Sequence, residues 1–187
     1  MPDRYYVVAI PFSGNGGWDG RFIADGQSPS EVAANPMFNM EVVTPQYFSA
    51  LGVPVLRGRA FSASDRESTV RVVILSQSAA QHYWPNEDPI GKRVKLADTS
   101  SSYLTVIGIV PDTRYRDLRT ARPSIYFALR QPFFPFVPTN LAIRTDVPPA
   151  ALVATVRRVV ANSSRASPSQ ARRHLGSISL DHSRRRA

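Results

Sequence analysis

The spacing of apolar residues along the chain predicts short strands interrupted by short helices. Runs rich in β-branched and aromatic residues predict strands at 5–10, 37–43, 70–75, 93–96, 103–110, 124–129 and 139–145. The run at 103–110 is apolar on both sides, which is typical of a central strand, and Gly108 within it indicates a bulge or a close neighbour. In the run at 37–43, Phe38, Met40 and Val42 alternate with polar residues, the period of a strand with one buried face.

Three helices are predicted from capping residues and from apolar stripes. The first spans 45–51, with Thr44 as its cap, Pro45 at its first position and Gly52 as its left-handed end, and its apolar face holds Tyr47, Phe48 and Leu51. The second follows Ser76 as its cap and ends at Pro85, with an apolar face of Ala79, Ala80, Tyr83 and Trp84. The third spans 150–160 and ends near Asn162, with a stripe of Leu152, Val153, Val156, Val159 and Val160.

The segments between these elements are expected to be turns and loops. Residues 13–36 are interpreted as loop with one short strand around Phe22 and Ile23, and 57–59 as a turn. The glycine cluster at 14–17 lacks the Lys-Ser/Thr of a phosphate-binding loop, and so does the segment 86–93 around Gly91 and Lys92. The sequence therefore gives no nucleotide-binding motif.

Composition allows one buried core and excludes several kinds of chemistry. The chain has 187 residues, of which 43% are hydrophobic and 20% charged, close to an average globular protein, and the mixture of elements predicts an α+β fold. The absence of cysteine excludes disulfides, thiolate metal sites and a cysteine nucleophile. His82 has no ligand partner at metal-binding spacing, and no polar residues form a catalytic constellation. We therefore expect no catalytic residue, cofactor or metal, and binding or structural coupling remains.

The region from Val43 to Phe61 also carries a pattern of residues that resembles a known family. The pattern is Val-Thr-Pro-x-Tyr-Phe-x-x-Leu-Gly-x-Pro-x-Leu-x-Gly-Arg-x-Phe, and it continues in 72–75, 83–85, 88–93, 106–110, 141–145 and 150–160. The chain is similar over most of residues 1–162 to the MacB-like periplasmic core domain of ABC transporter permeases.

This resemblance implies a particular division of the chain. A porter-like α/β part would be formed by the two ends of the domain, residues 5–55 and 137–162. A mostly β part, residues 56–136, would be inserted between them. Residues 163–187 fall outside this domain, and their serine- and arginine-rich composition, without an apolar face, predicts a disordered basic tail.

The resemblance also implies a location and partners. In such permeases the domain lies on the outer face of the cytoplasmic membrane, between two membrane helices, and couples ATP hydrolysis elsewhere to motion. The expected partners are an ABC ATPase domain or subunit, a second copy of the chain, or a periplasmic adaptor. The chain itself has no run of about 18–20 apolar residues and no signal peptide pattern, so these features alone predict that it stays in the cytoplasm.

Two segments are candidates for partner contact. The proline-interrupted segment 131–138 contains Phe133, Phe134 and Phe136, which would form an apolar patch if exposed. The loop at 112–122 carries Arg114, Arg116 and Arg119 and would suit an anionic partner, although a solvated loop with mutual ion pairs is the more common explanation of such a sequence.

Net charge supports one alternative from another functional class. The chain carries +9, and more than half of this excess lies from Ser163 onward. Basic segments bind nucleic acid phosphates, so a nucleic-acid-binding protein that uses its arginine-rich tail is the alternative function. The body of the chain shows no recognition helix and no aromatic RNA-binding signature, and on that ground no nucleic acid partner is expected. An enzyme is a third hypothesis.

Overall fold

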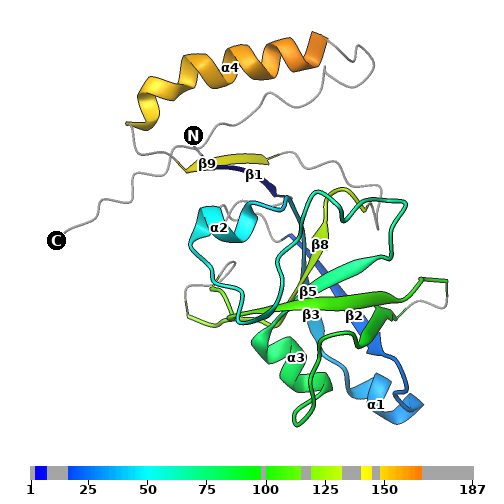
Figure 1. Ribbon diagram of the computed structural model, residues 1–187. Helices are drawn as coiled ribbons and strands as arrows, with labels where there is room; N and C mark the ends of the chain where they lie inside the picture. Colours follow the sequence, from blue (N-terminus) through cyan, green and yellow to red (C-terminus); the bar gives the residue numbers. More distant parts are fainter. Residues whose placement is uncertain are drawn as a thin grey trace. The chain divides into compact units, whose positions relative to one another are not determined.

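The computed structural model describes residues 3–7, 17–97, 100–114, 119–131, 140–144 and 148–165. The chain divides into two compact units, one from Asp3 to Arg144 and one from Thr145 to Ala187. Figure 1 labels most of the elements, and their order is β1 Asp3–Val7, β2 Trp18–Ala24, α1 Pro29–Ala34, β3 Met37–Val43, α2 Tyr47–Leu51, β4 Arg57–Gly58, β5 Val72–Ser76, α3 Gln77–Tyr83, β6 Arg93–Leu96, β7 Leu104–Val110, β8 Ser124–Ala128, β9 Asn140–Arg144 and α4 Pro149–Arg165.

Six strands of the first unit form a closed ring of pairings. The order is β7-β5-β8-β3-β2-β6, and β6 pairs back to β7 through Arg93 with Thr105 and Val94 with Leu104. The pairs β5–β7 and β3–β8 are parallel, the other four are antiparallel, and β4 adds to β7 outside the ring. Each of the six strands therefore has a neighbour on both sides, as in a small barrel.

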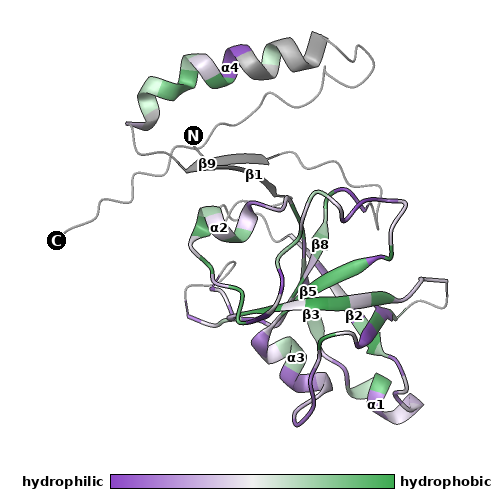
Figure 2. Ribbon diagram, in the orientation of Figure 1, coloured by the Kyte–Doolittle hydropathy of each residue, from purple (hydrophilic) through white to green (hydrophobic). Residues whose placement is uncertain are grey.

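Side chains from all six ring strands fill one hydrophobic core, which α3 extends. Phe22, Phe38, Leu75 and Val94 are among the fully buried residues of this cluster. The α3 side chains Ala79 and Ala80 join it, followed by Trp84 at the end of the helix, so the predicted apolar face of α3 is confirmed. Figure 2 shows the hydrophobic character of β5, which is buried at every position.

A second core lies on the other side of β3, β5, β7 and β8. Its central residues are Tyr47 and Phe48 of α2, Ile74 of β5 and Tyr126 of β8, all at most 2% exposed. The two cores meet different faces of β5, because Val73 and Leu75 belong to the first and Ile74 to the second. This alternation is the period of a strand buried on both faces.

A register shift in β7 allows the strand to serve both cores. The β5–β7 pairing runs Val73 with Val106 and then Ile74 with Gly108, so Ile107 is an extra residue. Gly108 also faces the backbone of the β4 segment, where a Cβ atom would lie 2.3 Å from the Arg59 carbonyl oxygen. Both predictions made for Gly108, a bulge and a close neighbour, are confirmed.

The segment from 13 to 36 contains more regular structure than the sequence predicts. In its described part, β2 has seven residues rather than a short strand, and α1 follows it. The inward positions of β2 include Gly20 and Ala24, whose small side chains conceal the apolar alternation. Helix α1 begins with a capping box in which Ser28 and Glu31 bond each other's backbone, a signal present in the sequence.

Strand β3 and helix α2 occupy their predicted places but bury different residues. β3 is buried on both faces, because Asn39 and Glu41 are covered as well as Phe38 and Met40. α2 begins at Tyr47 rather than at Pro45, and Gly52 ends it with a φ of 69° as predicted. Its inward face holds Ala50, whereas Leu51 is 36% exposed.

Strand pairing crosses the predicted boundary at residue 55. The interpretation from the family resemblance placed β2 and β3 in the part formed by the chain ends and β5 to β8 in the inserted part. In the structure these strands share one sheet, since β3 pairs with β8 and β2 with β6. β1 and β9 form a separate antiparallel pair, which does bring together the two ends of the first unit.

The second unit contains α4. This helix begins at Pro149 and continues to Arg165, three residues beyond its predicted end, so the first three residues of the predicted disordered tail are helical. Its stripe residues Leu152, Val153 and Val156 are half-buried, while Arg157 and Arg158 are exposed. Residues 166–187 lie outside the described residues. In the part of the chain that the structure describes, no helix has the length and apolar character needed to span a bilayer.

Candidate contact site

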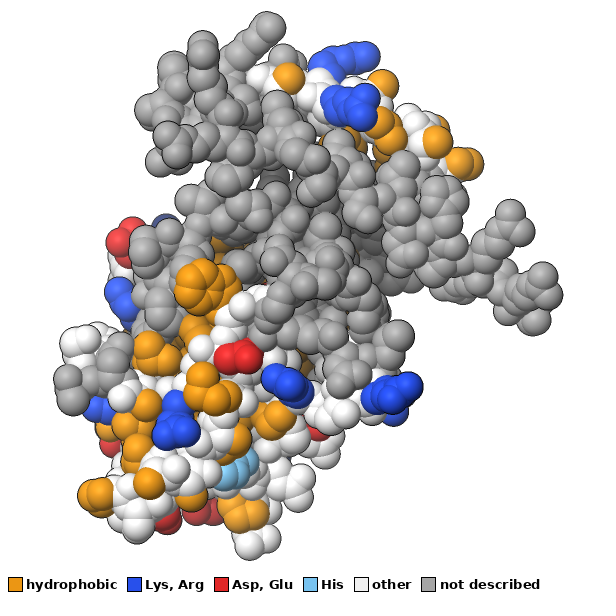
Figure 3. All heavy atoms as spheres, turned by 180° about the vertical axis from the view of Figure 1, so that it is seen from behind, with side chains coloured by type: hydrophobic (Ala, Val, Ile, Leu, Met, Phe, Trp, Pro, Cys, Tyr) orange, Lys and Arg blue, Asp and Glu red, His pale blue; other side chains and the backbone are white. Residues whose placement is uncertain are grey.

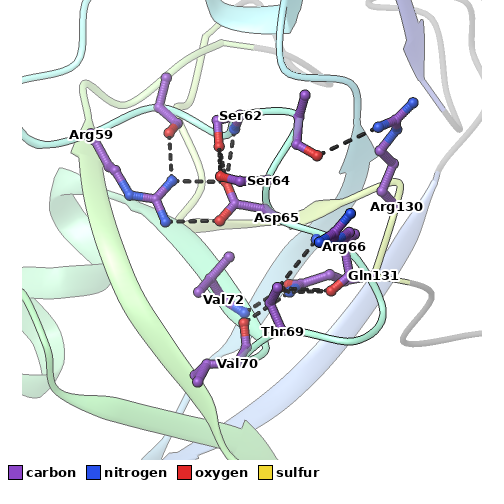
Figure 4. Close-up of polar contacts among 12 residues, drawn as sticks. Arg59, Ser62, Ser64, Asp65, Arg66, Thr69, Val70, Val72, Arg130 and Gln131 are labelled. Atoms are coloured by element: carbon purple, nitrogen blue, oxygen red, sulfur yellow. Dashed lines mark hydrogen bonds and ion pairs between the residues drawn. The ribbon is translucent and has the colours of Figure 1, made fainter.

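An ion pair between the half-exposed Arg59 side chain and buried Asp65 organises the loop between β4 and β5, which we name the anchored loop, residues 59–71. Asp65 is 4% exposed, and its two carboxylate oxygens accept hydrogen bonds from both terminal nitrogens of Arg59, each at 2.8 Å. The backbone N–H of Ser62 donates to the same carboxylate at 2.7 Å. The pair closes the first half of the loop on itself, as Figure 4 shows.

Gln131, at the end of the turn after β8, fixes the second half of the anchored loop. Its Oε1 accepts from the Val72 backbone N–H at 2.9 Å. Its Nε2 lies within bonding distance of the carbonyl oxygens of Arg66 and Val70 and the hydroxyl of Thr69, at 3.2, 2.8 and 2.9 Å. The amide is buried and joins residues at least 59 positions away in sequence, so the loop is tied to the barrel as well as held by its own contacts (Figure 4).

The anchored loop presents an apolar tip and basic side chains to solvent. Val70 is 72% exposed, the most exposed of the large hydrophobic residues described. Arg66 is exposed, and Arg130 is exposed and lies over the loop, its Nη1 3.4 Å from the carbonyl oxygen of Ala63. On the face that Figure 3 shows, basic, acidic and hydrophobic side chains of the described residues are interspersed. The exposed side chains of the anchored loop stand on a backbone that is fixed by hydrogen bonds, which suits them to contact with another molecule.

Electrostatics reinforce the ion pair within the loop. The Arg59 guanidinium holds the pKa of the Asp65 carboxyl below its ordinary value of 3.8, and hydrogen bonds from Ser62 act in the same direction against the effect of burial. The carboxylate therefore stays charged through the neutral range and well into the acid range.

A second polar network ties α1 and α3 to the barrel. Asn35 Nδ2 donates to the Phe22 carbonyl oxygen and to Gln27 Oε1, both at 2.8 Å. Asn35 Oδ1 is then the acceptor for His82 Nε2, at 3.1 Å, so His82 is a structural donor at the end of α3. Tyr83 also donates to the Phe22 carbonyl, at 2.9 Å, and burial raises the pKa of its hydroxyl. These contacts explain His82 without a ligand.

The start of α3 is capped by a residue from a distant loop. Ser76 stands at the predicted cap position, but its side chain makes no capping bond and instead accepts from the Ser124 N–H at 2.9 Å. Asp112, after β7, accepts from the N–H and hydroxyl of Ser78 at 3.1 and 2.7 Å. A carboxylate at a helix N-terminus is stabilising, so this contact fixes the beginning of the 111–114 segment.

The predicted contact residues fall largely outside this description. Phe133, Phe134, Phe136 and Arg116 lie outside the described residues. Arg114 is exposed, two residues after Asp112, and Arg119 is exposed in the next described segment. None of these six residues belongs to the anchored loop, residues 59–71. From the sequence, the residues between the turn at 57–59 and the strand at 70–75 are expected to be a loop. The local signal of its order is the spacing of Ser62 and Asp65, which is typical of a turn in which a carboxylate bonds a nearby backbone N–H.

The described residues do not assemble a metal site. No group of three or more His, Asp or Glu side chains among them could hold a metal ion. The polar side chains of the anchored loop and of the Asn35 network bond backbone groups and one another. Their geometry is suited to fixing loops on a barrel.

Comparison with known proteins identifies this architecture. The sequence model described as "MacB-like periplasmic core domain" matches residues 9–170, most of the chain. The chain belongs to this family. It is a MacB-like periplasmic domain of the kind found in bacterial ABC transporter permeases, as its sequence pattern predicted.

Two curated relatives match shorter stretches. Both are macrolide export ATP-binding/permease proteins MacB. One, from Mannheimia succiniciproducens, is 30% identical over 74 residues, which is 40% of this chain and 11% of that protein. The other, from Aggregatibacter actinomycetemcomitans, is 32% identical over 84 residues, 43% of this chain and 13% of that protein. The chain thus corresponds to a small part of these relatives.

Solved structures share the fold over most of the chain. The periplasmic region of MacB from Actinobacillus actinomycetemcomitans superimposes with a TM-score of 0.56 at 15% identity, covering 86% of this chain and 84% of that one. The extracellular domain of the noncanonic ABC-type transporter YknZ from Gram-positive bacteria gives 0.56 at 17% identity, covering 85% and 76%. The mixed α/β content is therefore shared with extracytoplasmic domains of transporters.

Proposed function

We propose that this chain is the extracytoplasmic domain, or part of it, of an ABC transporter permease, and that it transmits ATP-driven motion without catalysing a reaction. The family match supports the location and the class of protein. A domain that acts by transmitting motion needs a rigid body and contact surfaces rather than an active site. The transmitted motion would drive substrate export or change a contact with a partner.

The observation that carries this proposal is the way the first unit is closed and tied. Its six ring strands pair on both sides, and buried polar side chains bind the connecting loops to that ring. Asn35, Asp65 and Gln131 each fix a loop through several hydrogen bonds. Force applied at one point of such a structure moves the whole unit, because packed cores deform little.

Partners follow from the same proposal. An ABC ATPase domain or subunit would act through membrane helices, and the outer surface would meet a second copy of the chain or a periplasmic adaptor. We retain Phe133, Phe134 and Phe136, together with Arg114, Arg116 and Arg119, as contact residues. Their support is composition, since a segment with three phenylalanines and several prolines cannot form a regular strand or helix.

Distance measurements in the full-length permease test this function. This chain contains no cysteine, so cysteines introduced into it can be spin-labelled selectively once any cysteines in the rest of the permease have been replaced. Exposed Ser49 in α2 and Gln81 in α3 provide one pair within the first unit. Gln81 and exposed Ala154 in α4 provide a pair that joins the two units. Double electron–electron resonance should give the same distance between the labels of the first pair with and without ATP. For the second pair, the distance should change when ATP is added.

The two pairs make the outcomes distinct. A change within the Ser49–Gln81 pair would show that the first unit deforms and would contradict its role as a rigid body. If neither distance responds to ATP in a permease that hydrolyses it, the coupling function is wrong.

A further inference from the structure

The anchored loop carries more positive charge than it neutralises internally. Residues 59–71 together with Arg130 contain four arginines and two carboxylates. Arg59 is paired with Asp65. The ion pairs between described residues leave Arg66, Arg71 and Arg130 without a carboxylate partner, and Glu67 is the loop's other acidic residue. The anchored loop, which also carries exposed Val70, therefore has an excess of positive charge, and we call Arg66, Arg71, Arg130 and Val70 the basic patch.

The patch is held in place before any partner arrives. The carbonyl oxygens of Arg66 and Val70 both accept from Gln131, and Thr69 bonds the backbone of Arg66 in both directions, at 3.2 and 2.7 Å. When a partner covers Val70, little conformational entropy is lost, because the backbone that carries this side chain is already fixed. Arginine beside an exposed apolar residue is a composition enriched in protein interfaces.

The chemistry of the patch discriminates between classes of partner. Binding of single-stranded nucleic acid uses exposed aromatic rings for stacking, but the one aromatic residue of the loop, Phe61, is 4% exposed. A membrane surface requires an extended apolar face, whereas Val70 is one small side chain flanked by charges. Carboxylates form paired hydrogen bonds with arginine, as Asp65 does with Arg59 inside the loop.

We propose that the anchored loop is a docking site for an acidic segment of a partner protein, whose carboxylates bind Arg66 and Arg130 and whose apolar side chain covers Val70. This inference rests on the proposed function only in assuming that the domain works through protein contacts. It adds the place of the contact and the chemistry of the partner. The partner segment would bind through side-chain contacts rather than by adding a strand to the sheet, because each ring strand already pairs with a neighbour on both sides.

Selection from a phage-displayed library of random dodecapeptides on the immobilised full chain tests this site. We expect the enriched peptides to share glutamate or aspartate next to a large apolar residue. The charge reversal Arg66→Glu with Arg130→Glu should weaken their binding by at least about tenfold, and Val70→Ser should weaken it by a smaller factor. The matched control is Arg21→Glu with Lys95→Glu, which makes the same change in net charge elsewhere on the barrel, on β2 and β6. This control should leave peptide binding within about twofold of the unchanged chain.

Each other outcome overturns the docking site. Enrichment of peptides without acidic residues, absence of enrichment, or equal loss of binding in the control variant would each contradict it. A fluorescent DNA duplex is the second probe: if it binds with comparable affinity and is released by the Arg66 and Arg130 reversals, the patch recognises phosphates and the acidic-segment proposal is wrong. The spin-label distances do not depend on these variants, so the two proposals can fail separately.

Discussion

At the scale of single residues, several buried polar side chains, among them Asn35, Asp65 and Gln131, each make several hydrogen bonds that fix a loop. Asp65 is an informative example. Its carboxylate is buried, it accepts hydrogen bonds from Arg59 and Ser62, and its pKa lies below the ordinary value. A group whose folded pKa is depressed contributes stability above its unfolded pKa, and this contribution is lost as the pH falls through the folded value. For Asp65 the loss therefore begins near its ordinary value of 3.8 and proceeds at lower pH.

Replacing this carboxylate should destabilise the fold in a pH-dependent way. Asp65→Asn removes the charge that Arg59 binds, and we expect it to lower the free energy of unfolding at neutral pH by about 2 kcal/mol. Because protonation of Asp65 removes the same charge, the difference between the two proteins should shrink as the pH falls toward about 3. Urea unfolding at both pH values measures it, with Glu67→Gln, an exposed carboxyl in the same loop, as the control. A pH-independent difference would assign the effect to packing instead.

At the scale of elements, the crossing of the β4 segment over the bulged strand β7 admits only residues without a side chain. Gly58 and Gly108 pair directly, and a Cβ at Gly58 would lie 2.1 Å from the Ile107 carbonyl oxygen. Gly58 also has a φ of 71°, whereas Gly108 has no such requirement. Gly91 separates the two effects, because its φ is 82° and nothing lies near its missing side chain.

Alanine substitution at these three glycines should therefore give a ranked loss of stability. Gly91→Ala tests backbone strain alone and should cost about 1 kcal/mol. Gly108→Ala must displace the backbone at Arg59 and should cost about 2–3 kcal/mol, and Gly58→Ala combines both effects and should cost most. Thermal unfolding of the three variants measures the order. If Gly91→Ala proved as damaging as Gly108→Ala, the close approach of β4 to β7 would not be a determinant of stability.

Elements could be predicted where a local pattern was strong. The runs at 93–96 and 103–110 became β6 and β7 within one residue, since a short apolar run between turns has few alternative structures. The predicted length of β2 is too short, because Gly20 and Ala24 occupy its inner face and weaken the apolar alternation. Helix α1 was not predicted, although Ser28, Pro29 and Glu31 form a typical helix start. Burial of Asn39 and Glu41 on β3 could not be predicted, because polar residues in alternation normally face solvent.

Long-range contacts set the limit of prediction for the site. Gln131 looks like a surface residue after a strand, and its role becomes visible only when β8 and the anchored loop are side by side. Asp112 likewise replaces Ser76 as the cap of α3 across 34 positions of sequence. The family pattern, by contrast, was carried by local turns and caps such as the one at Gly52, and it could be identified from sequence because these are contiguous.

At the scale of the whole molecule, the described residues of the first unit form two cores. All six ring strands supply the first core, and α2 with Phe61, Ile74 and Tyr126 supplies the second. The segment begins directly after Gln131, which is buried and bonded to the anchored loop. Phe133, Phe134 and Phe136 lie outside the described residues, and the proposal that they form a partner contact rests on their sequence, in which prolines interrupt a run of phenylalanines.

Replacing all three phenylalanines by serine separates these roles. If they lie at a subunit or partner contact, the variant should keep nearly the unfolding temperature of the unchanged chain, because substitutions at a contact surface remove no core packing. Its self-association, followed by sedimentation velocity over a range of concentrations, should weaken, since aromatic residues dominate the energy of most interfaces. Phe38→Ser, a single change at a residue 1% exposed in the first core, is the control and should unfold or strongly destabilise the chain. Unfolding of the triple variant would place these side chains in the core, and unchanged association with an intact fold would remove them from a contact between copies.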